Sequence, residues 1–423
     1  MSWVNTLPEK WRLCRLKSVA NIRYGLGQPP AELSSGVAMV RATDVDAGTI
    51  RTDKLLLVDP AELPLDRNPY LKAGEIIVVR SGAYTGDSAI VPPALEGAIA
   101  GYDMVATVTR ASSQFVAYGL LSKYVLEDQI LLLTLRAAQP HLNAEELGGV
   151  IFAMPPTRHE QQCIAAYLDA SCAAIDAAVA AKRRQLETLE NLASSILLHS
   201  LTIGLCQDIE TRTTGASVLP HIPVEWRFGR LKSVAAIRYG LGQPPAELSS
   251  GVAMIRATDV DAGTIRTDKL LRVDPDELPP DRNPYLRAGE IIVVRSGAYT
   301  GDSAIVPAEL EGTVAGYDMI VTVTRASARF IAYCLLSRYV LEGQLLLLTL
   351  RAAQPHLNAE ELGSVLLALP PTLKEQEAIA DHLDVKLAEV KAIVTGIQAQ
   401  IATLTAYRKS LIHECVTGQR RVG

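Results

Sequence analysis

The chain of 423 residues lacks the features that would cross-link it, place it in a membrane or give it a basic surface. Its six cysteines form no C-x-x-C pair, which argues against a disulfide framework or a thiolate metal site. No apolar run approaches the roughly 18 to 20 residues that span a bilayer, and the first residues lack the apolar core of a secretory signal. A net charge of −5 argues against a freestanding nucleic-acid-binding protein with a basic face. These absences predict a cytoplasmic protein with no membrane association.

An internal repeat is the strongest feature that is present. The segment LKSVANIRYGLGQPPAELSSGVAMV from Leu16 recurs almost unchanged from Leu231, and the offset of 215 residues then holds to the end of the chain. Between residues 16 and 156, roughly five residues in six are identical to their counterparts. The length allows two domains of ordinary size plus connecting helices. The repeat therefore predicts a globular module followed by a helix, present twice.

Each module has the pattern of a mixed α/β domain. Apolar runs bounded by turn-forming residues predict strands at 37–40, 75–79, 89–91, 104–109 and 150–154. A short amphipathic segment is expected at 16–22, and one helix is expected from about Ser113 to Gln129. None of the six cysteines recurs in the other copy, so incidental or buried thiols are the better interpretation of them.

The stretch from Pro156 to about Leu201 predicts one long helix, and 372–417 predicts its copy. Thr157 and Glu160 match a T-x-x-E capping box directly after two prolines. Apolar residues then keep the 4-3 spacing of a heptad, interrupted by Lys182 where the copy has Ile397, and such a seam requires a partner helix. The predicted pairing residues are Ile175, Val179, Leu186, Leu189 and Ile196 in the first helix, and Val390, Val394, Ile397, Ile401, Leu404 and Leu411 in the second.

Two like helices in one chain predict an antiparallel intramolecular coiled coil with approximate two-fold symmetry. The seam of about 25 residues corresponds to a rod on the order of 35 to 40 Å, about one turn of B-DNA. The fold class is α+β, with two mixed α/β domains separated by the helices. The expected boundaries are 1–156 for the first domain, 157–201 for the first helix, 202–222 for a linker, 223–371 for the second domain and 372–417 for the second helix.

Three pairs of segments resemble a known family. They are the openings LPEKW and IPVEW, the segments LKAGEIIVVRSGAYTGDSAIV and LRAGEIIVVRSGAYTGDSAIV, and QPHLNAEELGGVIFAMPPTRHEQQCIAAYLD with its second copy. The last is the most specific and contains the pairs Glu160-Gln161 and Glu375-Gln376. On these segments the whole chain resembles the specificity subunit of type I restriction-modification systems.

The resemblance implies two target-recognition domains that alternate with two long helical regions, which set the distance between two half-sites in double-stranded DNA. It also implies a non-catalytic chain that binds two methyltransferase subunits through its helices, with restriction (translocating nuclease) subunits in the full complex. No cofactor is expected in this chain, whereas S-adenosylmethionine, and ATP with Mg, are expected in the partner subunits. The partners can supply much of the charge that neutralises phosphate, so this acidic chain should bind DNA weakly alone.

Motifs for catalysis do not survive comparison of the copies. Asn68-Pro69-Tyr70 lacks the second proline of a methyltransferase motif and is better interpreted as a turn. The acidic cluster at 274–277 becomes Asp59-Pro60-Ala61-Glu62 in the first copy, so one catalytic acid is missing there. His141 and His356 have no Cys or His at ligand spacing, and no metal site is predicted.

Polar loop residues that follow apolar runs are the candidates for DNA contact, because Arg, Asn and Gln can reach base edges while Ser, Thr and Tyr can bind phosphates. Arg23 and Arg51 belong to the same loops as these candidates. The competing interpretation is that such residues only form turns or support the fold. The predicted DNA-binding residues are Tyr24, Gln28, Arg41, Thr43, Arg80, Ser81, Tyr84, Thr85, Arg136, Gln139, His141 and Asn143, with Tyr239, Gln243, Arg256, Thr258, Arg295, Ser296, Tyr299, Thr300, Arg351, Gln354, His356 and Asn358 in the second copy.

The sequence therefore predicts a DNA-recognition subunit for a bipartite, interrupted target. Because the two modules are nearly identical, a two-fold arrangement would make the target a palindrome. The alternative is a protein-interaction scaffold with duplicated modules on a coiled-coil spacer, which would show no preference among DNA sequences.

Overall fold

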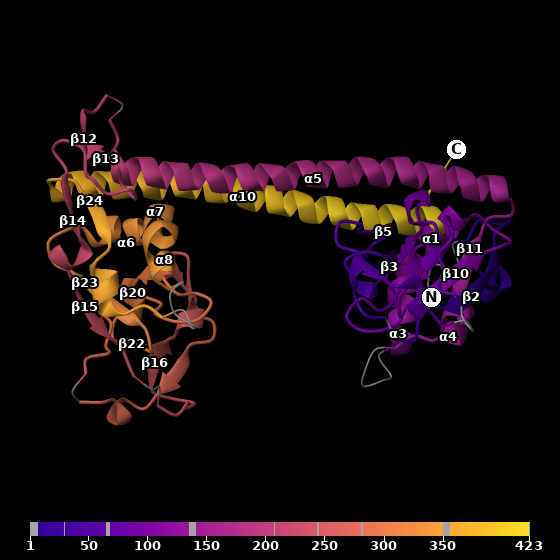
Figure 1. The fold of residues 1–423 in the computed structure, drawn as a ribbon, viewed down its shortest axis with the longest axis horizontal. Coiled ribbons are helices and arrows are strands. Elements are labelled where there is room, and N and C mark those ends of the chain that lie inside the picture. Colours follow the sequence, from indigo (N-terminus) through magenta and orange to yellow (C-terminus); the bar gives the residue numbers. More distant parts are fainter. Residues whose placement is uncertain are drawn as a thin grey trace. The chain divides into compact units, whose positions relative to one another are not determined.

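The structure is a computed structural model that describes residues 7–28, 30–64, 68–134, 141–206, 208–242, 245–280, 282–349 and 356–422. The chain divides into two compact units, residues 1–183 with 398–423 and residues 184–397. Each unit contains one copy of the module, part of helix α5 (Arg158–Thr202) and part of helix α10 (Leu373–Val416) (Figure 1). The α+β fold with two modules and two long helices is as the sequence predicts.

The first unit is built from short strands and helices. Its strands are β1 (Arg12–Arg15), β2 (Ala20–Tyr24), β3 (Val37–Val40), β4 (Val45–Asp46), β5 (Thr49–Ile50), β6 (Leu56–Val58), β7 (Ile76–Val78), β8 (Ser88–Ile90), β9 (Ile99–Ala100), β10 (Met104–Val108) and β11 (Ile151–Met154). Its short helices are α1 (Ser113–Leu121), α2 (Lys123–Val125), α3 (Leu131–Thr134) and α4 (Ala144–Gly149), with a π turn at Leu126–Ile130. All five expected strands are present in this module.

Two local expectations need correction. The segment at 16–22 forms a 3-10 turn, Leu16–Ser18, and then begins β2, because the chain joins the sheet there. The helix expected from Ser113 to Gln129 breaks at Ser122, where ψ is 148° and the hydroxyl donates to the Gly119 carbonyl at 2.5 Å. Serine side chains compete with the helical hydrogen bonds in this way, so the apolar periodicity alone missed the break.

A four-stranded antiparallel sheet, in the order β2-β10-β7-β8, forms the centre of the first module. Successive residues of a strand point to opposite faces. Ile76 and Val78 therefore join the core beneath α1, α2 and the long helices, whereas Ile77 and Val79 join a second core on the other face. Burial on both faces explains why this strand is a continuous apolar run.

Smaller sheets complete the module. Strands β6-β3-β9 form a mixed sheet, β4 and β5 form a hairpin, and β1 pairs antiparallel with β11. The β1–β11 pair joins the two ends of the module immediately before α5 begins. This closure places the start of the long helix directly on the domain core.

The second unit repeats the same plan. Its strands are β12 (Thr211–Thr213), β13 (His221–Pro223), β14 (Arg227–Arg230), β15 (Ala235–Tyr239), β16 (Val252–Ile255), β17 (Val260–Asp261), β18 (Thr264–Ile265), β19 (Leu271–Val273), β20 (Ile291–Val293), β21 (Ser303–Ile305), β22 (Val314–Ala315), β23 (Met319–Val323) and β24 (Leu366–Leu369). Its short helices are α6 (Ala328–Leu336), α7 (Arg338–Val340), α8 (Leu346–Thr349) and α9 (Ala359–Gly363). The strand order β15-β23-β20-β21 matches that of the first module.

The segment between the first helix and the second module contains a β-hairpin, which the sequence pattern did not reveal. Strands β12 and β13 pair antiparallel, and Leu219 and Ile222 from this segment are buried in the core of the second unit. The linker is therefore partly packed against the module that follows it.

The long helices pack against each other within each unit (Figure 1). In the first unit, Ile175 in the first half of α5 shares a core with Leu411 near the end of α10, and Val179 and Leu404 pack on it. In the second unit, Ile196 packs on a core that contains Leu383 of α10. The helices are therefore antiparallel. Of the other predicted pairing residues, Val390 and Ile397 are buried, and Leu186, Leu189, Val394 and Ile401 are half-buried.

Paired side chains anchor each helix on its module and explain the two Glu-Gln pairs. Gln161 is buried, accepts a bond from the Ser112 backbone N–H (2.8 Å) and donates to the Pro155 carbonyl (3.2 Å). Thr157 caps the helix by accepting from the Glu160 N–H, but the Glu160 carboxylate accepts from the Trp11 indole (2.9 Å). Thr157 therefore makes its half of the predicted capping box, whereas Glu160 binds Trp11 of the module and does not complete the box. The second copy repeats the indole bond and both glutamine bonds.

Helix α5 also corrects the expectation about apolar stretches. It contains an 18-residue window with a mean hydropathy of 1.5, which is long and apolar enough to cross a membrane by composition. Alanines make this window apolar without long side chains. Its larger residues Leu168 and Ile175 pack in the core of the first unit, and 28% of the window is buried inside the protein.

Candidate nucleic-acid interface

Three neighbouring strands of the central sheet, β2, β10 and β7, bring residues that are distant in the sequence together at one end of the strands. In the first module, Tyr24 at the end of β2 pairs with Met104 at the start of β10, and Val78 at the end of β7 pairs with the same residue. The residues just beyond these strand ends, Arg80 and Tyr102, therefore lie beside Tyr24.

Arg80 lies between two tyrosine rings. Its guanidinium carbon is 4.7 Å from the ring centre of Tyr24 and 4.3 Å from that of Tyr102. Its Nη2 donates to Nε2 of His141 at 2.9 Å, which makes Nε2 the unprotonated ring nitrogen in this contact. Contacts on three sides fix the guanidinium, so little side-chain entropy would be lost when it binds a ligand.

The second module forms the same cluster. Arg295 lies 4.7 Å from the ring centre of Tyr239 and 4.3 Å from that of Tyr317, and it donates to His356 at 2.7 Å. We use the name arginine–tyrosine cluster for Tyr24, Arg80, Tyr102 and His141, and for their counterparts Tyr239, Arg295, Tyr317 and His356.

A buried aspartate accepts a hydrogen bond from the backbone N–H of each arginine. Asp103 is 1% exposed, and its Oδ1 accepts a bond from the Arg80 backbone N–H at 3.2 Å. Burial raises the pKa of Asp103 to about 6, although the bond to Arg80 and its charge oppose the rise. Within the described residues, Oδ2 of Asp103 and Nε of Arg80 have no hydrogen-bond partner. Asp318 repeats the bond to Arg295 and has its pKa raised to about 6 for the same reasons.

Exposed tyrosines lie beside the guanidinium and in the neighbouring turn. Tyr24, Tyr84 and Tyr102 are 38%, 48% and 42% exposed. Tyr84 lies in the turn between β7 and β8, which Gly82 and Gly86 close with φ angles of +85° and +91° that disfavour other residues. A fixed arginine with exposed tyrosines combines charge for phosphate, hydrogen-bond donors for base edges and flat surfaces for stacking.

Several predicted contact residues have bonds within the fold. Thr85 is buried and donates to the Gly82 carbonyl, and Ser81 is half-buried in a bridge with His141. Asn143 caps α4 by accepting from the Glu146 N–H at 2.9 Å. Their counterparts Ser296, Thr300 and Asn358 make the corresponding contacts.

The loop after β3 is also held internally. Arg41 binds the Asp44 carboxylate through Nε and Nη2, both at 3.0 Å, and donates to the Lys54 carbonyl. Arg256 makes the corresponding bonds. Gln28, Thr43, Thr258 and Tyr299 are exposed. Arg23 forms two bonds to Glu75 within the module, and Arg51 donates to the Thr43 carbonyl.

Five predicted residues lie outside the described residues: Arg136, Gln139, Gln243, Arg351 and Gln354. Tyr102 and Tyr317 were missed by reasoning from the sequence. The available signal was the segment Gly-Tyr-Asp-Met, which is identical in both copies and places an aromatic residue in a turn before a strand.

A family model described as Type I restriction modification DNA specificity domain matches residues 223–403. The repeat relates this segment to residues 8–188. The chain is 21% identical over 434 residues to the Type I restriction enzyme EcoBI specificity subunit of Escherichia coli, covering 98% of this chain and 87% of that protein.

Two solved structures have a similar fold over almost the whole chain. One, titled "Structural basis underlying complex assembly and conformational transition of the type I R-M system", is 19% identical with a TM-score of 0.75 and covers 98% of this chain and 99% of that one. The HsdS subunit from Thermoanaerobacter tengcongensis is 18% identical with a TM-score of 0.52 and covers 98% of each chain. At these identities, the two structures establish the fold.

Proposed function

We propose that the chain is a specificity subunit of a type I restriction-modification system and that it recognises DNA through its two arginine–tyrosine clusters. It is the non-catalytic subunit that gives such a complex its sequence specificity. The proposal rests on one observation: a preorganised arginine with exposed tyrosines recurs at the same strand ends of the central sheet in both modules. We assign DNA recognition to residues 1–156 and 223–371, and spacing of the half-sites to 157–201 and 372–417.

The near identity of the modules specifies the kind of target. The residues of one cluster and their counterparts in the other are of the same type, and their ring distances agree. Two equivalent readers that face DNA in opposite orientations bind the same half-site on opposite strands. We therefore propose an interrupted palindrome as the recognition site.

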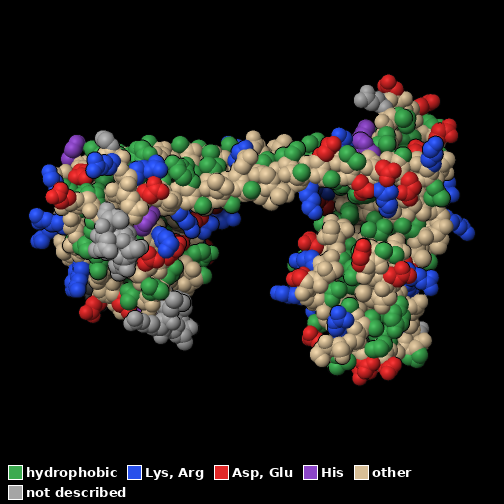
Figure 2. Space-filling view, turned by 180° about the vertical axis from the view of Figure 1, so that it is seen from behind, with side chains coloured by type: hydrophobic (Ala, Val, Ile, Leu, Met, Phe, Trp, Pro, Cys, Tyr) green, Lys and Arg blue, Asp and Glu red, His purple; other side chains and the backbone are tan. Residues whose placement is uncertain are grey.

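The methylation chemistry belongs to partner subunits. Hydrophobic side chains are visible on the helices in Figure 2, and Leu192, Leu198, Val385 and Ile393 are about half-exposed. Exposed apolar residues on paired helices fit the docking of further helices. We propose two methyltransferase subunits as the partners, which bring S-adenosylmethionine, and restriction subunits that bring ATP with Mg. A cytoplasmic complex follows from this role.

Methylome sequencing of cells that express this chain with its methyltransferase tests the function. The expected result is one methylated motif with two inverted, identical half-sites. An asymmetric bipartite motif would contradict the palindrome while leaving DNA recognition intact. The scaffold alternative predicts instead that a purified complex binds all competing DNA sequences equally.

A further inference from the structure

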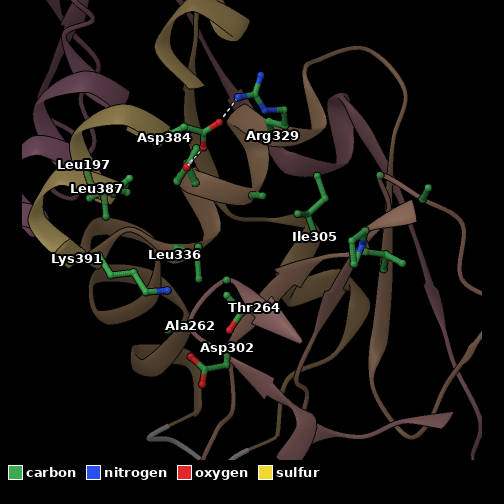
Figure 3. A pocket seen from close by; sticks show the side chains of 18 of the residues that line it. Leu197, Ala262, Thr264, Asp302, Ile305, Arg329, Leu336, Asp384, Leu387 and Lys391 are labelled. Atoms are coloured by element: carbon green, nitrogen blue, oxygen red, sulfur yellow. Dashed lines mark hydrogen bonds and ion pairs between the residues drawn. The ribbon is translucent and has the colours of Figure 1, made fainter. Parts of the chain in front are cut away.

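A groove of about 800 Å³ lies inside the second unit, between the module and the long helices. Its apolar wall includes Ile305 at the end of β21, Leu336 of α6 and Leu387 of α10 (Figure 3). The side chains of Lys391 and Asp302 lie toward one end of it, and the Arg329–Asp384 pair lies toward the other. The volume is in the range of ligand-binding sites.

The first unit shows what closes the corresponding groove there. Arg408 of α10 lies in it, bonded to Asp176 of α5 (3.1 Å) and to the Ala47 carbonyl (3.4 Å). Its side chain is only 16% exposed. The remaining space is about 220 Å³. In the first unit, therefore, the side chain of Arg408 occupies the groove.

The second unit has no arginine at the equivalent position. At the position equivalent to Arg408 it has Ala193, and at the position equivalent to Asp176 it has Lys391. Neighbouring Lys409 likewise becomes Ser194. The open groove therefore coincides with substitutions at these positions, whereas Tyr333 and Leu336 on the module side repeat Tyr118 and Leu121.

The open groove also contains two charges without partners. Arg329 is satisfied by Glu377, Asp381 and Asp384, but neither Asp302 nor Lys391 forms an ion pair with a residue that the structure describes. Burial raises the pKa of Asp302, and Asp261 adds to the rise. Burial also raises the pKa of the equivalent Asp87, but there Lys409 opposes the rise.

We propose that this groove binds an apolar peptide segment of the methyltransferase subunit, whose side chains cover the aliphatic wall. A peptide group presents one donor and one acceptor, which suits a carboxylate and an ammonium at the same end of a groove. Asp302 accepts from a backbone N–H of the segment, and Lys391 donates to a backbone carbonyl. Each chain binds one such segment, because Arg408 occupies the other groove. This inference rests on the proposed function.

The repeat supplies a matched control for the experiment. Ala388 and Ala173 occupy equivalent, exposed positions on the two grooves. Ala388→Trp in the full chain should weaken binding of the purified methyltransferase at least tenfold, because the indole projects into the space that the segment would occupy. Ala173→Trp should change binding less than twofold. Unaltered thermal unfolding confirms that both variants are folded.

Photo-crosslinking gives a second measurement that does not depend on affinity. Benzoylphenylalanine at position 388 should crosslink to an apolar segment of the methyltransferase, and at position 173 it should not. Equal effects at both positions, or no effect and no crosslink at 388, would overturn the docking site while the wild-type chain still binds methyltransferase. A wild-type chain that binds no methyltransferase would overturn both the partner assignment and the groove.

Discussion

Replacing Arg80 by alanine should weaken specific DNA binding of the assembled complex by about 5- to 150-fold. A guanidinium that contacts a base edge contributes about 1–3 kcal/mol, and about 1.4 kcal/mol corresponds to a factor of ten. Tyr24 and Tyr102 hold the group in place at 4.7 and 4.3 Å, so alanine removes an arginine that is already oriented. Arg80→Lys should recover little, because an ammonium cannot reproduce the planar fork.

The duplication makes this prediction quantitative. Arg295→Ala should have the same effect as Arg80→Ala at a palindromic site, and the double variant should lose the product of the two factors. Binding is measured by titrating labelled duplex at several fixed salt concentrations. A contact to phosphate would lower the salt slope by about 1 and weaken all sequences equally, whereas a base contact relaxes one position in each half-site.

The matched control is Arg12→Ala, which removes the same charge from an exposed position on β1. It should change the affinity less than twofold. If Arg80→Ala and Arg12→Ala behave alike, the arginine–tyrosine cluster does not contact DNA.

Three further predictions concern folding and assembly. A fragment of residues 1–205 lacks Leu411, Ile412, Cys415 and Val416 of the first-unit core. The fragment should self-associate, because the equivalent part of α5 from a second copy can replace these residues. A folded monomer in sedimentation at micromolar concentration would contradict this. Gln161→Leu leaves the Ser112 N–H and the Pro155 carbonyl without their bonds, which costs about 1–3 kcal/mol each. Calorimetry should therefore show the unfolding temperature of the first unit lowered by roughly 4–24 °C. Gln376→Leu should lower that of the second unit by the same amount. The raised pKa values of Asp103 and Asp318, about 6 in the folded protein, mean that the native state binds more protons than the unfolded state between about pH 4 and 6. Stability therefore falls as pH rises through that window, by on the order of 3 kcal/mol for each group, and the Asp103→Asn/Asp318→Asn variant should be more stable than wild type in denaturant titrations at pH 7.5 but not at pH 4.

The sequence predicted the helices and strands better than it predicted which of them lie next to each other. Apolar runs located the strands, and the heptad spacing located the long helices, because both patterns reflect local periodicity. Tyr102 was missed for a different reason. It meets Arg80 only because β10 lies between β2 and β7, and the order of strands in a sheet is not encoded in the period of any one strand.

Candidate residues chosen by type were also difficult to separate by role. Asn143 and Arg41 have the chemistry to bind bases, but in the fold they cap a helix and bind a nearby carboxylate. Short polar side chains next to turns satisfy local backbone groups first. Glu160 shows the reverse case, since its spacing fits a local cap and its partner is Trp11, 149 positions earlier.

The division into units has a consequence for synthesis of the protein on the ribosome. The second unit is one continuous stretch, whereas the first needs residues 398–423 at the far end of the chain. At about 5–20 residues per second, translation takes about 10–40 s to progress from residue 183 to residue 398. During this time the first module exists without Leu411 and Ile412, so its apolar surface is open to chaperones or to the helix of another nascent chain. The N-terminal module is therefore synthesised first but completed last.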